Sequence, residues 1–143
     1  NYILYKKELL EVFSLVNNYL YPGGIFIFDF NTDYKYREVI GETTIAENRD
    51  TCSFIWENYY DEEEHINEYD VTIFVQEEDD LFRKFTETHV QRGYTPDEIK
   101  TLIRQAGMEL IEVRDADTDD QVTEKTQRVL MVARESSKQE ITL

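Results

Sequence analysis

The chain has 143 residues, of which 41% are hydrophobic and 13% aromatic, enough for one domain with its own core. Its 15 lysines and arginines stand against 31 aspartates and glutamates, and the resulting net charge of −16 argues against direct contact with nucleic acid or anionic membranes. The single cysteine, Cys52, excludes an internal disulfide, and no apolar run approaches the roughly 20 residues that cross a bilayer, so we expect a cytoplasmic protein.

The first predicted element is an amphipathic helix over residues 5–19. Its apolar stripe consists of Leu9, Phe13, Val16 and Leu20. Pro22-Gly23-Gly24 ends this helix and turns the chain. The run Ile25–Phe28 lacks polar alternation and predicts a strand buried on both faces, as in a parallel sheet that helices cover.

Residues 34–93 change in character, because β-branched and aromatic residues alternate there with polar ones. Four strands are predicted near residues 42–48, 51–60, 66–76 and 81–92. Acidic turns at 61–64 and 77–80 separate the last three. This pattern indicates an antiparallel meander with one covered face and one wet face.

The segment Thr95-Pro96-Asp97-Glu98 predicts a helix start, with Thr95 as N-cap and Glu98 closing a capping box. Gly107 ends that helix, and strands are predicted near 108–113 and 128–133. The chain therefore divides into a helix and central strand (1–33), an inserted meander (34–93), a helix with two strands (94–134) and a polar tail expected to fray (135–143).

Taken in order, these segments resemble the C-terminal half of a class I S-adenosylmethionine-dependent methyltransferase. LYPGGIFIFD at 20–29 looks like the family's L-x-P-G-G turn and fifth strand. Residues 94–108 look like its helix leading into the sixth strand, and 127–134 like its antiparallel last strand. ETHVQRGY at 87–94 is similar to the end of an antiparallel sheet that one bacterial subgroup inserts after the fifth strand.

The resemblance implies an α/β fold: the C-terminal half of a Rossmann-like methyltransferase sheet with an inserted antiparallel β-meander. It also implies that the meander forms a lid over the methyl-acceptor pocket. In the family's sheet the fifth strand lies between the fourth and the seventh, so the strand at 25–30 would have an unpaired apolar edge here. We therefore expect self-association, or exchange of elements between copies, when the chain is studied alone.

The resemblance implies S-adenosylmethionine as the cofactor of the complete protein. The family holds it mainly through a glycine-rich loop after the first strand and an acidic residue at the end of the second. The five glycines here, at 23, 24, 41, 93 and 107, form no such loop. Asn1 and Tyr2 resemble the segment after the family's fourth strand and are candidates for cofactor contact. If these residues are the whole polypeptide, we expect no useful cofactor binding.

His89 is the candidate catalytic residue, because it could orient or deprotonate a methyl acceptor. The alternative is a strand histidine that is hydrogen-bonded to a neighbour. Arg92 could bind an anionic substrate group, although the acidic excess favours a carboxylate of the protein itself as its partner.

Asp29 and Asn31 follow the predicted strand at the edge where open α/β sheets bind ligands. They could touch substrate or cofactor, or could cap the turn. Trp56 and Tyr59, with Tyr60 and Tyr69, could line an aromatic acceptor pocket, or could be ordinary sheet packing.

No metal site is predicted. Asp115-x-Asp117-x-Asp119 begins like a calcium loop, but Asp120 stands where that loop needs glycine and Thr126 where it needs glutamate. Two histidines and one cysteine without a zinc motif make no convincing zinc set.

The sequence therefore predicts part of an enzyme that methylates a small-molecule or protein acceptor, with this chain supplying the acceptor-side half and the lid. The alternative is a non-catalytic binding or assembly module that uses the antiparallel sheet as a ligand or partner surface.

Overall fold

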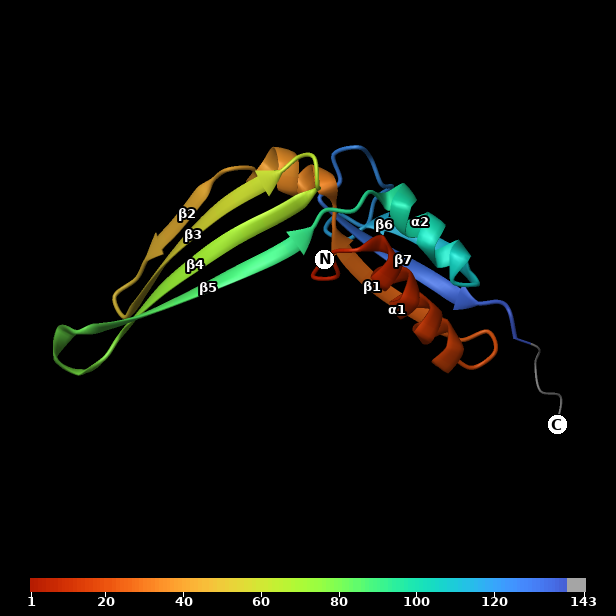
Figure 1. Cartoon of the computed structure of the whole chain (residues 1–143), viewed down its shortest axis with the longest axis horizontal. Helices are drawn as coiled ribbons and strands as arrows, with labels where there is room; N and C mark the ends of the chain where they lie inside the picture. Colours follow the sequence, from red (N-terminus) through yellow and green to blue (C-terminus); the bar gives the residue numbers. More distant parts are fainter. Residues whose placement is uncertain (139–143) are drawn as a thin grey trace.

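A computed structural model describes residues 1–138 (Figure 1). A three-stranded core sheet that carries two helices meets a four-stranded sheet that extends away from it. In chain order the elements are α1 (Lys6–Tyr19), β1 (Ile25–Asn31), a π-helix (Lys35–Ile40), β2 (Thr44–Asn48), β3 (Cys52–Asp61), β4 (Ile66–Gln76), a short 3-10 helix (Glu78–Asp80), β5 (Phe82–Arg92), α2 (Pro96–Gln105), β6 (Met108–Asp115) and β7 (Arg128–Glu135).

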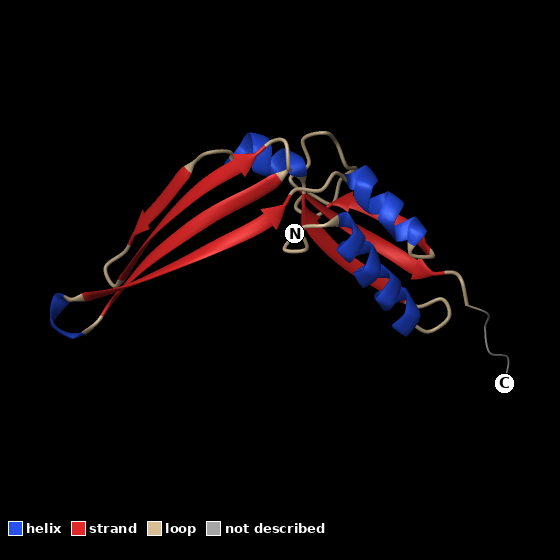
Figure 2. Cartoon of the chain, in the orientation of Figure 1, coloured by secondary structure: helices blue, strands red, loops and turns tan. Residues whose placement is uncertain are grey.

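The core sheet has the strand order β1-β7-β6, and β7 is antiparallel to both of its neighbours. Helices α1 and α2 pack on one face of this sheet (Figure 2). The Phe13 ring lies 6.1 Å from the ring of Phe26 and 5.2 Å from that of Phe28. The buried cluster also includes Leu9, Phe30, Ile99, Leu102, Ile103, Val129, Met131 and Ala133. Alternate residues of each strand therefore fill one shared core.

The prediction that β1 is buried on both faces is wrong for this chain. Phe26, Phe28 and Phe30 face the helices, whereas Ile25 and Ile27 are 45% and 61% exposed. The reason is that α1 and α2 cover the same face, and no element within residues 1–138 covers the other. Among the strands that the structure describes, β1 pairs only with β7, so its second edge is open.

Strands β2 to β5, here called the meander sheet, pair in sequence order and are all antiparallel. The register sets Trp56 opposite Val71 and Tyr69 opposite His89. Because side chains alternate along a strand, Trp56, Tyr69 and His89 project from the same face. The predicted meander is present, and its strand boundaries lie within two residues of those expected from the sequence.

The capping box of α2 is also confirmed. The Glu98 backbone N–H donates to the Thr95 hydroxyl at 3.3 Å, and the Thr95 backbone N–H donates to the Glu98 carboxylate at 2.8 Å. By contrast, the π-helix at Lys35–Ile40 was not predicted, although it buries Tyr36 at the base of the meander sheet.

The predicted tail, 135–143, begins too early. Glu135 is the last residue of β7 and is only 1% exposed. Its carboxylate accepts hydrogen bonds from the backbone N–H groups of Gly23, Ser137 and Lys138. These hydrogen bonds satisfy the carboxylate although it is buried. Residues 139–143 lie outside the described part of the chain. Within residues 1–138, no helix has the length and apolar character needed to cross a membrane.

Candidate functional site

A pocket of about 390 Å³ lies on one face of the meander sheet. It is lined by Cys52, Ser53, Phe54, Trp56, Tyr69, Val71, Ile73 and His89. These residues come from β3, β4 and β5, and the register described above brings them together. Apolar and aromatic walls with a few polar groups are typical of small-molecule sites.

Three aromatic rings form a row along this pocket. Tyr69 and His89 stack with ring centroids 4.8 Å apart and an angle of 14° between their planes. Trp56 lies 5.1 Å from Tyr69. Tyr2, which precedes α1, places its ring 5.9 Å from that of His89. The start of the chain therefore reaches the pocket of the meander sheet.

The polar atoms of this row are joined to one another. The Tyr2 hydroxyl lies 3.1 Å from the Tyr69 hydroxyl and 3.0 Å from Nδ1 of His89. Nε2 of His89 lies 3.3 Å from the Glu87 carboxylate. Burial, with a smaller contribution from the Tyr2 hydrogen bond, raises the pKa of Tyr69 well above its usual range. Tyr69 therefore stays protonated at neutral pH.

Asn1 and Asn31 lie together at the carboxyl end of β1. The Asn1 amide donates to the backbone carbonyls of Asn31 at 2.7 Å and Arg92 at 2.8 Å, and the Asn31 backbone N–H donates back to Asn1 at 2.8 Å. The Asn31 side chain donates to the Tyr36 hydroxyl, which itself donates to Gln91 at 2.7 Å. Burial raises the pKa of Tyr36 to about 12. These bonds join the core sheet to β5.

The remaining predicted residues lie apart from the pocket. Tyr59 is 58% exposed and projects from the opposite face of β3 to Trp56. Arg92 pairs with no carboxylate in the described residues; it donates to the Leu4 carbonyl at 3.1 Å and stacks over the Tyr94 ring. Asp29 forms an ion pair with Arg128 across the β1–β7 pair, on the uncovered face of the core sheet.

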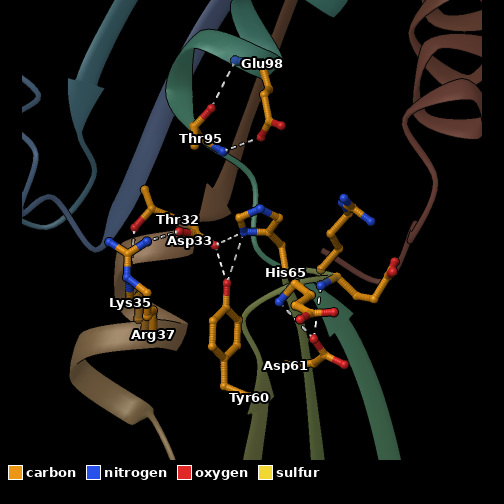
Figure 3. Close-up of polar contacts among 12 residues, drawn as sticks. Thr32, Asp33, Lys35, Arg37, Tyr60, Asp61, His65, Thr95 and Glu98 are labelled. Atoms are coloured by element: carbon orange, nitrogen blue, oxygen red, sulfur yellow. Dashed lines mark hydrogen bonds and ion pairs between the residues drawn. The ribbon is translucent and has the colours of Figure 1, made fainter.

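A second polar cluster, which the sequence did not indicate, centres on Asp33 (Figure 3). Its carboxylate accepts from the Tyr60 hydroxyl, from Nδ1 of His65 at 2.8 Å and from the Arg37 guanidinium at 2.9 Å. Asp33 is 5% exposed, whereas the side chains of Arg37 and His65 are each about half-exposed. Burial, together with the Asp33 hydrogen bond, raises the pKa of Tyr60.

The Asp33 cluster joins the two sheets. Asp33 follows β1, Tyr60 lies in β3, and His65 ends the β3–β4 turn with a backbone φ of 55°. Gly93, after β5, packs so closely that a Cβ there would lie 2.8 Å from the Asp33 Cα. Nothing in the composition of the acidic turn Asp61–Glu64 reveals that His65 folds back onto the core.

The chain was compared with protein-family models, curated proteins and solved structures. No protein-family model matches the chain. It is 29% identical over 134 residues to a Geobacillus sp. (strain WCH70) protein and 29% identical over 136 residues to the Bacillus subtilis (strain 168) protein YqeM, both named "putative methyltransferase". These matches cover 94% and 95% of this chain and 54% and 55% of the relatives. The chain thus spans about half the length of these curated relatives.

A solved structure agrees with the sequence matches. An S-adenosylmethionine-dependent methyltransferase from Clostridium acetobutylicum ATCC 824 superposes with a TM-score of 0.88 and 26% identity, over 96% of this chain and 55% of that one. The chain has the class I methyltransferase fold. The resemblance drawn from the motifs and the predicted fold class are both confirmed.

The glycines of this methyltransferase-like chain do not form the glycine-rich loop through which the family mainly holds S-adenosylmethionine. Gly23 lies in the α1–β1 turn, Gly41 follows the π-helix, Gly107 ends α2, and the space beside Gly93 is filled by Asp33. Only Gly93 lies between a strand and the helix that follows it, and one glycine does not make a glycine-rich loop. The segment Asp115–Asp119, which begins like a calcium loop but was not predicted to be one, is a closed turn, because the Asp115 carboxylate accepts from the backbone N–H groups of residues 117 and 118. The described residues contain no cluster of three candidate metal ligands.

Proposed function

We propose that this chain is the acceptor-side half of a cytoplasmic S-adenosylmethionine-dependent methyltransferase. The complete protein transfers a methyl group to a small molecule bound in the meander-sheet pocket. One observation carries the proposal: Tyr2, from the core segment that precedes α1, meets Tyr69 and His89 at that pocket. The row of aromatic rings along the pocket and the methyltransferase fold also support an acceptor site at this position.

The residues have distinct roles in this proposal. Trp56 and Tyr69 supply the apolar walls that hold the acceptor and exclude water. His89 orients the acceptor or takes its proton, while alignment of the reacting atoms provides most of the rate enhancement. Asn1, Asn31 and Arg92 hold the segment that carries Tyr2 against β5 and thereby set the shape of the pocket. A volume of about 390 Å³ favours a small molecule over a protein side chain with its surrounding surface.

Intrinsic fluorescence tests the acceptor site directly, because Trp56 is the single tryptophan of the chain. We expect small aromatic or alicyclic compounds that bear a hydroxyl or amino group to change Trp56 emission saturably. Ile73→Asp, which places a charge in the pocket wall, abolishes the change. Tyr59→Phe, on the opposite face of β3, leaves it intact. Equal responses in both variants would assign the signal to non-specific binding.

Methyl transfer is then measured with the complete protein, radiolabelled S-adenosylmethionine and the compounds that bind the pocket. We expect incorporation of label into at least one of them, and loss of that incorporation in His89→Gln. Failure to methylate any pocket-binding compound would remove the enzyme assignment.

The alternative function is a non-catalytic binding or assembly module that uses the antiparallel sheet as a ligand or partner surface. Assembly between copies draws further support from the uncovered side of the core sheet. Ile25 and Ile27 are exposed beside the open edge of β1, and such an edge favours strand pairing between copies. If the alternative holds, sedimentation shows a discrete dimer that Ile27→Lys dissolves, and the Trp56 titration shows no saturable ligand.

A further inference from the structure

Four side chains at the pocket form one continuous chain of hydrogen bonds. The Tyr69 and Tyr2 hydroxyls are 3.1 Å apart, and the Tyr2 hydroxyl is 3.0 Å from Nδ1 of His89. Nε2 of His89 is 3.3 Å from the Glu87 carboxylate. The contacts thus run in the order Tyr69, Tyr2, His89 and Glu87.

The direction of these bonds follows from the chemistry of the groups. An ionised carboxylate only accepts, so Nε2 of a neutral His89 carries the proton and donates it to Glu87. Nδ1 is then bare and accepts from the Tyr2 hydroxyl. The Tyr2 oxygen, having used its own proton, accepts from the Tyr69 hydroxyl. One assignment of protons thus satisfies all three contacts.

The two ends of the chain lie in different surroundings. Tyr69 is part of the pocket wall, next to Trp56. The Glu87 side chain is 68% exposed, and that of His89 is 30% exposed. Tyr2 is itself 59% exposed, so the hydrogen bonds lead from Tyr69 in the pocket wall to groups that contact solvent.

We propose that Tyr69, Tyr2, His89 and Glu87 form a proton path that carries the acceptor's proton from the pocket to water. This inference rests on the proposed function. As the acceptor heteroatom bonds to the methyl group of a sulfonium donor, and the sulfur–methyl bond breaks, the heteroatom releases its proton to the Tyr69 oxygen. The Tyr69 proton moves to Tyr2 and the Tyr2 proton to Nδ1 of His89, which gives an imidazolium facing Glu87. The Nε2 proton then leaves to water at the exposed end.

The proton path gives roles to Tyr69 and Glu87 in addition to His89. Tyr69 is the catalytic residue that meets the acceptor, and Glu87 is a positioning residue that fixes the tautomer of His89. It also defines the acceptor class: a hydroxyl or a neutral primary or secondary amine, whose nucleophilic atom carries a proton that is released on methylation, and not a tertiary amine or thioether, whose nucleophilic atom carries none.

Nuclear magnetic resonance of the ¹⁵N-labelled chain tests the path without any ligand. At a pH where both histidines are neutral, we expect His89 to carry its proton on Nε2. His65, whose Nδ1 faces Asp33 at 2.8 Å, should carry its proton on Nδ1 and so provides the opposite signal in the same spectrum. Glu87→Ala raises the Nδ1-protonated share of His89 by about fivefold, the factor that one net hydrogen bond is worth.

Two further variants complete that experiment. Glu87→Gln keeps an oxygen acceptor for Nε2 and therefore keeps the tautomer. Glu68→Ala removes a carboxylate from the opposite face of β4 and leaves the spectrum of His89 unchanged. Protonation of Nδ1 in the unmodified chain, or an equal response to Glu87→Ala and Glu68→Ala, would overturn the path.

Kinetics of the complete protein supply a second, separable readout. Tyr2→Phe and Glu87→Ala should each lower kcat by about tenfold or more for a hydroxyl acceptor, with little change in its KM, because they act on proton removal and not on the pocket wall. Unchanged kcat in both variants would refute the path while leaving the methyltransferase assignment in place. Absence of methyl transfer in the unmodified protein would refute the proposed function, whatever tautomer His89 shows.

Discussion

Replacing Asp33 by alanine provides the sharpest test of how the two sheets are held together. The substitution removes one carboxylate that accepts hydrogen bonds from Tyr60, His65 and Arg37. Asp29 offers a matched control, since it too pairs with an arginine, but its side chain is 40% exposed whereas that of Asp33 is 8% exposed.

The expected cost can be worked out donor by donor. The Tyr60 hydroxyl is buried, so losing its acceptor costs about 1–3 kcal/mol. Arg37 and His65 are half-exposed and can turn to water, so each adds about 0.5 kcal/mol or less. We therefore expect Asp33→Ala to lower the free energy of unfolding by about 2–3 kcal/mol. Asp29→Ala breaks only an exposed ion pair and should cost at most about 1 kcal/mol.

Urea unfolding followed by circular dichroism measures both losses, provided that the m-value stays constant. Asp33→Asn, which keeps one carbonyl acceptor for Tyr60, should fall between the two alanine variants. If Asp33→Ala and Asp29→Ala differ by less than about 0.5 kcal/mol, the Asp33 cluster does not stabilise the junction and the reasoning from burial fails.

The remaining predictions concern pH, a close backbone approach and the cofactor. Burial raises the pKa of both Tyr36 and Tyr94 to about 12, so each loses its proton near pH 10 in the unfolded chain but not in the folded one. The contribution of these two tyrosines to the free energy of unfolding should therefore be constant well below pH 10 and smaller by about 1.4 kcal/mol per tyrosine at pH 11; an identical pH profile for Tyr36→Phe would contradict this. Gly93→Ala should cost about 2 kcal/mol or more in urea unfolding, because its Cβ would collide with Asp33, and a loss below about 0.5 kcal/mol would show that the backbones separate easily. Calorimetry with S-adenosylmethionine should show no tight 1:1 binding to these 143 residues, which lack the glycine-rich loop, and a micromolar complex would disprove that expectation.

Local features of the fold could be predicted from the sequence because they depend on neighbouring residues. The start of α2 needs only Thr95 and Glu98, three residues apart, and both halves of the capping box formed. The meander followed from alternation and from acidic turns that keep successive strands antiparallel. The burial of β1 was misjudged because apolar composition indicates what a strand would bury, and not whether a covering element is present in the same chain.

The site was only partly predictable, because its geometry depends on long-range register. Trp56 and His89 were candidates, yet their meeting through Tyr69 requires the pairing of three strands. The contact of Tyr2 with His89 joins residues 87 positions apart, and no periodicity reports it. No sequence motif links Asp33 with His65, and their partnership appears only once both sheets are folded.

The central place of β7 has a consequence for how the protein is made. Register pairs Ile25 with Arg134, so the β1–β7 pair cannot form until residue 134 has left the ribosome. The meander strands, each paired with the next in sequence, can associate much earlier. During synthesis the phenylalanines of β1 therefore lack the β7 side chains with which they share a core, and this interval is when we expect a nascent-chain chaperone to matter most.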